Sequence, residues 1–296
     1  MDAAGNTGTA SAAAVVNIAT STPAPSAPTF ASVTIDTAHA GDGANAFGTI
    51  VHTVDGAAGQ IYALYDGLFG RDPDLLGYEG WLSASAHGAS PRDIAAAMLA
   101  SPEGVAKFGS LDNAAFVEQL YETALHRPAD SGGLQGWLSQ LSHGASRADV
   151  ALGIALSSEN VAGMQQSLAA GVFAPDPDAS NVARLYYGLL GRAPDANGLT
   201  DWTSHLEQGA SLGSVVQEFM NSAEYQKSHA GMTNAQLVDS LYVNALGRHA
   251  EPSALQQWVD ALAHGASQTT VAAAIVESPE AQQHHLSQIE KGWVHT

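Results

Sequence analysis

Apolar residues recur along most of this chain with the spacing of an amphipathic helix. From Ile61 to Phe69 they fall at i, i+3, i+4, i+7 and i+8, which places them on one face of a helix with about 3.6 residues per turn. The same stripe returns from Val117, Val182 and Val238. We therefore expect four equivalent helices in a protein that is mainly α-helical.

Each stripe opens a longer pattern that predicts three further helices. In the first copy Gly70 suits a left-handed helix end, and Asp74 can cap a second helix by accepting backbone N–H bonds. Gly88 ends that helix, and the serine two residues later caps a third. Ser101, with a proline directly behind it, opens a short fourth helix. The pattern therefore predicts a four-helix repeat.

An arginine, an acidic residue, a tryptophan and a glutamate recur at fixed positions in every copy. In the order of the copies they are Arg71, Asp74, Trp81, Glu103; Arg127, Asp130, Trp137, Glu159; Arg192, Asp195, Trp202, Glu224; and Arg248, Glu251, Trp258, Glu280. Successive tryptophans are 137 − 81 = 56, 202 − 137 = 65 and 258 − 202 = 56 residues apart. This spacing predicts two pairs of repeats, and hence two helical lobes.

The segment before the repeats has a different period. Between Phe30 and Asp36 apolar and polar residues alternate, and Phe47 to Val54 is a second β-prone run, so a hairpin is expected. A lone hairpin is marginal in water, so it must pack on its own helical body, the commoner arrangement, or on another molecule. Residues assigned to such an assembly surface are Phe30, Val33, Ile35, Phe47, Ile50 and Val51.

These patterns divide the chain into six segments. The expected division is a flexible lead-in over 1–28, a β-hairpin segment over 29–55, helical lobe one over 57–168, an inter-lobe insertion over 169–179, helical lobe two over 180–286 and a tail over 287–296. The lead-in is rich in alanine, serine, threonine and proline, a composition that cannot bury enough apolar surface to fold.

The net charge of the chain and its lack of cysteine limit the kinds of molecule that it can bind. The chain has 10 basic and 29 acidic residues, a net charge of −19, and it has no cysteine. Nucleic acids and anionic lipid surfaces attract basic proteins, so both are unlikely partners. Thiolate metal sites and thiol nucleophiles are excluded, and no apolar run is long enough to insert in a membrane. His-Glu-x-x-His, Gly-x-Ser-x-Gly and P-loop motifs are absent, so we expect no enzyme.

The motif residues carry a resemblance to a known family. Leu-Tyr, Gly-Arg-x-Pro-Asp-x-x-Gly-Leu, Trp, Gly-Ala-Ser and Ser-x-Glu resemble the bacterial family catalogued as domain of unknown function 4214, over about residues 57–286. Members of that family occur mainly in large exported or cell-surface proteins, often beside calcium-binding repeats and type 1 secretion signals, and the fold looks like that of phycobilisome linker domains. The resemblance implies an exported, non-catalytic structural part. The fourth copy departs from the motif, with Glu251 and Ala254 where aspartate and glycine are expected.

Each candidate binding group has a structural alternative. The recurrent arginine could grip a ligand, but a residue present in every copy usually serves the fold, and Arg71 can reach helix-end carbonyls, Asp74 or Glu103. The tryptophans could stack on sugars, but their register with aliphatic residues favours core packing. His87, His143 and His264 share one repeat position, and one histidine per repeat does not make a zinc site.

Calcium is the one metal that the sequence leaves open. The candidate oxygen ligands are Asp42, Asp72, Asp74, Asp176 and Asp178. Carboxylates suit Ca²⁺, but none of these residues has EF-hand spacing, and the prolines between them suit ordinary turns.

The sequence therefore predicts a non-catalytic structural protein, located outside the cell or on its surface. The leading hypothesis is a homo-oligomer or polymer that forms an extracellular filament, surface layer or matrix, with the amino-terminal β segment adding to a neighbouring copy. The alternative is a cell-surface adhesion module that binds polysaccharide.

Overall fold

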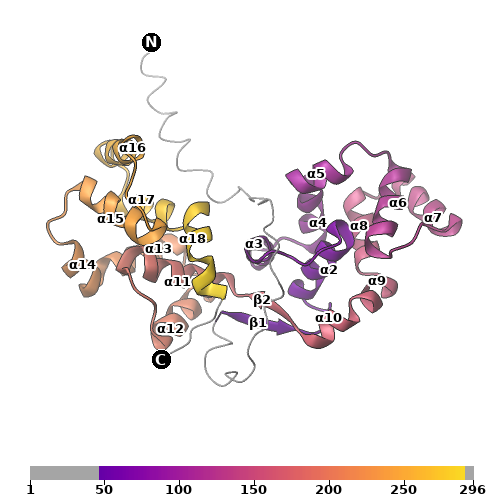
Figure 1. Cartoon of the computed structure of the whole chain (residues 1–296), viewed down its shortest axis with the longest axis horizontal. Coiled ribbons are helices and arrows are strands. Elements are labelled where there is room, and N and C mark those ends of the chain that lie inside the picture. Colours follow the sequence, from indigo (N-terminus) through magenta and orange to yellow (C-terminus); the bar gives the residue numbers. More distant parts are fainter. Residues whose placement is uncertain (1–46, 291–296) are drawn as a thin grey trace, which may run out of the picture. The chain divides into compact units, whose positions relative to one another are not determined.

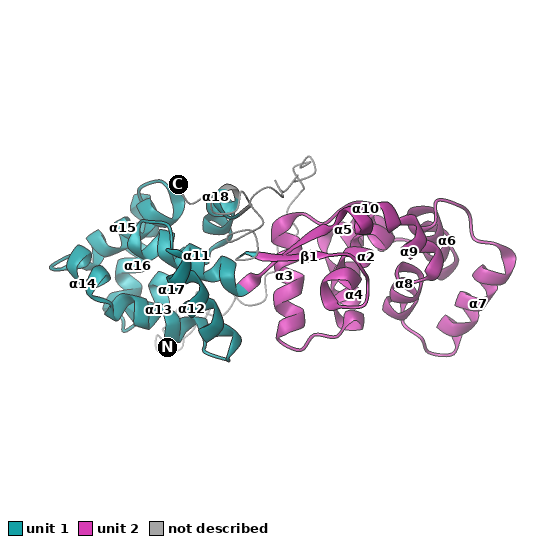
Figure 2. Ribbon diagram, turned by 90° about the horizontal axis from the view of Figure 1, so that it is seen from below, with its two compact units in different colours: residues 1–21, 36–47, 178–296 teal, residues 22–35, 48–177 magenta. Residues whose placement is uncertain are grey.

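The structure is a computed structural model that describes residues 47–290, and these residues fold almost entirely as helices (Figure 1). They divide into two compact units, coloured separately in Figure 2. Unit 2 comprises residues 48–177, and unit 1 comprises Phe47 with residues 178–290. The mainly helical fold of four tandem repeats is as the apolar stripes predicted, with two repeats in each unit.

Unit 2 holds the first two repeats. Its elements are β1 (Gly48–Val51), α2 (Ala57–Phe69), α3 (Leu75–Ala86), α4 (Pro91–Ala100), α5 (Pro102–Phe108), α6 (Asn113–Ala124), α7 (Ser131–Ser142), α8 (Arg147–Ala155), α9 (Ser158–Gly163), α10 (Gln165–Ala170) and β2 (Val172–Pro175). Helix α10 was not predicted, because its six residues follow α9 without a cap signal of their own.

Unit 1 holds the third and fourth repeats. Its elements are α11 (Pro177–Leu190), α12 (Ala196–Glu207), α13 (Leu212–Asn221), α14 (Ala223–His229), α15 (Asn234–Leu246), α16 (Pro252–Ala263), α17 (Gln268–Val276) and α18 (Pro279–Glu290). None of the helices between residues 47 and 290 has both the length and the apolarity to span a bilayer.

The helix ends follow the capping chemistry of the sequence. Asp74, Asp130 and Asp195 accept backbone N–H bonds at the start of the second helix of their repeats, whereas Glu251 makes no such bond. The first helix of three repeats ends at a glycine of positive φ, and His126 adopts a φ of 53° at that position in the second repeat. The left-handed turn is therefore required by the repeat, since it forms even where the residue is not glycine.

The two repeats of a unit share one core. In unit 2, α4 lies beside α8, and α2 packs against both α6 and α8 (Figure 1). A Cβ added at Gly67 of α2 would lie 2.8 Å from the Cβ of Ala155, so the two backbones approach closely. In unit 1 the matching Gly188 packs on Val276. A repeat therefore buries its apolar face only by pairing with its neighbour.

The strand expected between Phe47 and Val54 forms, but its described partner was not predicted. β1 pairs in antiparallel register with β2, from Gly48 opposite Pro175 to Val51 opposite Val172. The residues of β2 belong to the segment expected to be an inter-lobe insertion, and β2 also packs on α3. His52 Nδ1 lies 2.9 Å from the carbonyl oxygen of Leu168 and ties the end of β1 to α10.

The assembly residues proposed from the sequence differ in exposure. Ile50 is 43% exposed, Val51 is half-buried and Phe47 is buried. Phe30, Val33 and Ile35, which form the other expected strand, lie outside the described residues.

Candidate functional site

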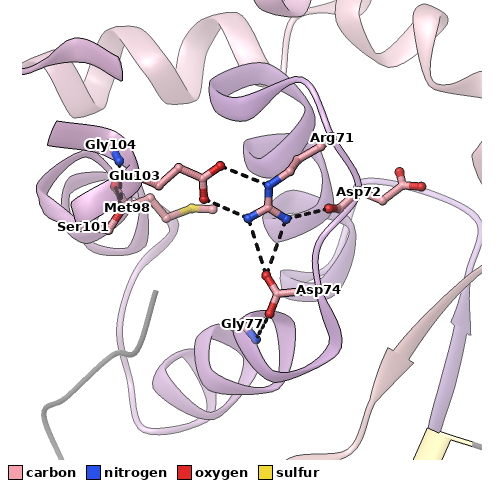
Figure 3. A network of polar contacts seen from close by, with 8 residues as sticks. All are labelled: Arg71, Asp72, Asp74, Gly77, Met98, Ser101, Glu103 and Gly104. Atoms are coloured by element: carbon pink, nitrogen blue, oxygen red, sulfur yellow. Dashed lines mark hydrogen bonds and ion pairs between the residues drawn. The ribbon is translucent and has the colours of Figure 1, made fainter. Parts of the chain in front are cut away.

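The recurrent arginine joins the end of the first helix to the start of the fourth. Arg71 follows the left-handed turn after α2, and Figure 3 shows its guanidinium facing Glu103 at the start of α5. Nε and Nη2 of Arg71 donate to the two carboxylate oxygens of Glu103 over 3.1 and 2.8 Å. The pair is therefore bidentate, the strongest geometry for these two groups.

The same guanidinium also holds the start of the second helix. Nη1 of Arg71 donates to the carbonyl oxygen of Asp72 over 3.0 Å and lies 3.5 Å from Oδ2 of Asp74, whose other oxygen caps α3 at the N–H of Gly77 (Figure 3). The guanidinium carbon lies 5.1 Å from the centre of the Tyr65 ring, within range of a cation–π interaction. One side chain thus connects three of the four helices in the repeat.

All four repeats contain this cluster. The short Nη2-to-glutamate distances are 2.8 Å for Arg71–Glu103, 2.8 Å for Arg127–Glu159, 2.8 Å for Arg192–Glu224 and 2.9 Å for Arg248–Glu280. Each arginine also donates to the carbonyl of the following residue and lies over the tyrosine of its own repeat. The recurrence that singled these residues out in the sequence reflects one conserved geometry within this chain.

The exposure of the recurrent arginine varies between the copies. The Arg71 side chain is 27% exposed, against 38% for Arg127 and 41% for Arg192 and Arg248. Hydrogen bonds from the arginine lower the pKa of Glu159, Glu224 and Glu280 below its ordinary value. These carboxylates stay ionised and paired at neutral pH, so none is poised as a general acid.

The glycine of the motif has a steric role. A Cβ added at Gly77 would lie 2.3 Å from the Tyr65 hydroxyl, and the matching distances are 2.3 Å at Gly133 and 2.1 Å at Gly198. In the fourth repeat Ala254 takes this position, and the hydroxyl of Tyr242 accepts a hydrogen bond from Nε1 of Trp258 over 3.0 Å. The tyrosine hydroxyl therefore fills the space that three of the repeats keep free of a side chain.

The tryptophans belong to the packing of their repeats but are not all buried. Trp81 is 8% exposed, whereas Trp137, Trp202 and Trp258 are half-buried. A Cβ added at Gly153 of α8 would contact the Trp137 ring at 2.7 Å, and Trp202 packs on Phe219 with ring centres 4.9 Å apart. Each of these two rings packs on the third helix of its own repeat.

The candidate metal ligands do not converge in the described part of the chain. Asp72 accepts a hydrogen bond from Tyr62 over 2.8 Å, and Asp74 serves as helix cap and arginine partner. Between residues 47 and 290 no three histidine or acidic side chains form a group that could hold a metal ion. Asp42 lies outside this range, Asp176 directly precedes α11, and Asp178 lies in the first turn of that helix.

The remaining arginines connect one repeat with the next, and they give no repeat signal in the sequence because they do not recur. Arg92 of α4 pairs with Asp149 of α8, and Arg147 donates to the carbonyl oxygen of Leu111 over 2.6 Å. In unit 1, Arg184 pairs with Glu277 over 2.8 Å in the interior. Every arginine of the chain therefore has an acidic or carbonyl partner in its own unit.

Fold and cluster together define a helical repeat protein whose charged motif residues tie the helices of each repeat to one another. One family, described as a domain of unknown function (DUF4214), matches the chain in tandem segments over residues 57–108, 95–164, 174–229 and 216–285. These segments cover well over half of the sequence, and the chain belongs to this family. No curated protein and no solved structure matches it.

Removing the arginine of one repeat tests its structural role. We expect Arg71→Ala to lower the free energy of unfolding of unit 2 by about 1.5 kcal/mol, because charged hydrogen bonds in a partly buried site are lost. Arg127→Ala should cost less, since that side chain is more exposed to water. Calorimetry on both variants measures the difference, and equal melting temperatures for Arg71→Ala and the parent chain would contradict the role.

Proposed function

We propose that this chain is a non-catalytic structural protein of the cell exterior that self-assembles into a filament, layer or matrix. The observation that carries the proposal is that the recurrent charged residues are engaged inside their own repeats. Each arginine of the cluster is saturated by a glutamate, a carbonyl and a tyrosine ring, which leaves no free cation at the recurrent position to bind substrate. A repeat whose recurrent charged side chains bind one another suits a scaffold.

The strand pair supports a role for the amino-terminal segment in assembly. β1 leads directly from that segment into unit 2, where it is one of only two strands found between residues 47 and 290. Ile50, at 43% exposure, is among the most exposed large apolar residues of this range. A two-stranded sheet offers backbone groups to which a strand of a second copy can add.

The first experiment is the molar mass of the purified chain by size-exclusion chromatography with light scattering. Calcium at millimolar concentration in one buffer and a chelator in the other test whether the acidic residues need the ion for assembly. We expect species larger than the 30.4 kDa chain. A monodisperse monomer in both buffers would overturn the proposal.

Two truncations separate assembly from folding. Deletion of residues 1–46 keeps β1 in place, and we expect it to abolish assembly while the helical signal and the melting of both units stay unchanged. Deletion of residues 1–55 also removes β1, so β2 loses its partner and unit 2 should melt at a lower temperature. If the chain without residues 1–46 still assembles, the amino-terminal segment is not the assembly element.

A second candidate function rests on the half-buried tryptophans. Trp137, Trp202 and Trp258 keep part of their ring surface exposed, and aromatic rings of this kind stack on sugars. Under this alternative the monomer is an adhesion module for polysaccharide. Binding on a glycan array with quenching of tryptophan fluorescence would favour it over assembly.

A further inference from the structure

Unit 1 buries a polar cluster in the seam between its two repeats. Arg184 of α11 is 1% exposed, and its Nε donates to Oε2 of Glu277 over 2.8 Å. Glu277 caps the end of α17 in the next repeat and is 6% exposed. Nη2 of Arg184 also donates to the side-chain oxygen of Asn181. The two repeats are thus joined by an ion pair that is shielded from water.

Two more polar side chains are buried in the same unit. Ser180 lies one turn before Arg184 on α11 and is fully buried. His285 of α18 is 4% exposed, and its ring stacks on that of Tyr187 with centres 4.7 Å apart.

In unit 2 the positions that match four of these side chains are apolar, whereas Asn181 corresponds to the polar Gln60. Unit 1 repeats unit 2 at an offset of 202 − 81 = 121 residues, measured between the tryptophans that open each pair. At this offset Ser180, Arg184, Glu277 and His285 correspond to Gly59, Ala63, Leu156 and Met164. Ala63 and Met164 are buried, and Leu156 packs against the core of unit 2. At these four positions the seam is therefore polar in unit 1 and apolar in unit 2, which buries a different polar side chain, Asn160.

We propose that the Arg184–Glu277 pair is a recognition element that makes the third repeat pair with the fourth and with no other repeat. In the native arrangement both seams are satisfied, because charge meets charge in unit 1 and hydrocarbon meets hydrocarbon in unit 2. If the fourth repeat paired with the first, Glu277 would face Ala63. If the third paired with the second, Arg184 would face Leu156.

Both exchanged pairings bury a charge opposite an apolar side chain. An uncompensated buried charge lowers the population of an exchanged pairing relative to the native one by about a hundredfold or more. The close approach of Gly67 to Ala155 recurs as that of Gly188 to Val276 and does not discriminate. The Arg92–Asp149 pair of unit 2 is exposed, so water solvates both charges and it discriminates less than a buried pair does. A chain of four similar repeats benefits from such a device, because the pairing faces share the same close helix contacts.

Cysteine pairs in this cysteine-free chain report which repeats have paired. Thr269 of α17 and Gln217 of α13 are in contact at the surface of unit 1, so Gln217→Cys with Thr269→Cys forms the native cross-link. Ala96 of α4 is exposed and occupies the position that matches Gln217, since 217 − 96 = 121. Ala96→Cys with Thr269→Cys therefore reports pairing of the first repeat with the fourth. One sample of each variant is oxidised without unfolding, and a second is oxidised after refolding from denaturant. Mass spectrometry measures how much more cross-linked protein the refolded sample contains.

The exchanged cross-link is compared in three full-length backgrounds. In the parent background it should not rise on refolding. With Arg184→Ala and Glu277→Leu, which give unit 1 the residues of unit 2, it should rise by about tenfold or more. With the charges reversed, Arg184→Glu and Glu277→Arg, it should stay at the parent level, because the ion pair is retained.

Two results would overturn the proposal. The first is an exchanged cross-link that is no more abundant in the apolar background than in the parent. The second is failure of the apolar variant to fold, judged by its helical circular dichroism, since unit 2 folds with these same residues at the seam. The native cross-link between positions 217 and 269 shows in each background that oxidation is efficient.

Discussion

Arg184→Ala is expected to destabilise unit 1 by about 3–5 kcal/mol, because it leaves the Glu277 carboxylate buried without its cation. Both side chains are almost completely shielded, at 1% and 7% exposure. Adding Glu277→Leu should restore most of the lost stability, since removing both charges costs far less than removing one. Calorimetry measures the change in melting temperature, and the unfolding transition that shifts is assigned to unit 1.

Arg192→Ala is the matched control for that experiment. Arg192 lies two residues after Leu190, the last residue of the helix that carries Arg184, but its side chain is 41% exposed and its partner Glu224 is 47% exposed. Exposed pairs contribute little because water already solvates both charges. If Arg184→Ala costs no more than Arg192→Ala, the buried pair has no special part in the stability of unit 1.

Acidification from pH 7 to pH 5 is expected to destabilise unit 1 by about 2 kcal/mol through His285 alone. Burial, reinforced by the positive charges of His284 and Arg184, lowers the pKa of His285 from 6.5 to about 4. The unfolded chain therefore takes up a proton as the pH falls below 6.5, whereas the folded unit does not until about pH 4. The contribution of His285 to the stability of unit 1 is therefore complete above pH 6.5, its pKa in the unfolded chain, and is lost as the pH falls toward 4.

His285→Met removes the titrating group and inserts the residue found at the matching position of unit 2, Met164. The variant should show a flat stability between pH 7 and pH 5 in urea titrations, whatever its absolute stability. The arginine-bonded carboxylates have lowered pKa values, so their protonation changes the stability mainly below pH 5. An unchanged pH slope in His285→Met would contradict the assignment.

The sequence was sufficient for the cluster of each repeat because recurrence and capping chemistry act locally. The sequence offers helix-end carbonyls, Asp74 and Glu103 as alternative partners of Arg71, and the structure shows the arginine–glutamate bond in all four copies. The tryptophan spacing predicted two pairs of repeats, and two compact units contain them.

Contacts between distant segments could not be predicted in the same way. β2 is only four residues long, and a single four-residue run has too few alternations to identify a distant partner. Val172 pairs with Val51, 172 − 51 = 121 residues earlier, and Pro175 pairs with Gly48, 175 − 48 = 127 residues earlier. Arg184 and Glu277 are 93 residues apart and each occurs once, so repetition gave no signal for them. A comparison of unit 1 with unit 2 at equivalent positions does distinguish both residues, because Ala63 and Leu156 stand where unit 1 has Arg184 and Glu277.

The separation of the cluster residues along the chain has a consequence for synthesis on the ribosome. Each arginine and its glutamate are 32 residues apart, so one repeat can close as soon as its own last helix has emerged. The apolar face that the repeat presents to its neighbour stays open until the next repeat follows. The apolar face of the third repeat stays exposed until Glu277 has been synthesised. Until then the Arg184 guanidinium is solvated by water, and the cost of burying this charge disfavours packing of the third repeat against the completed unit 2.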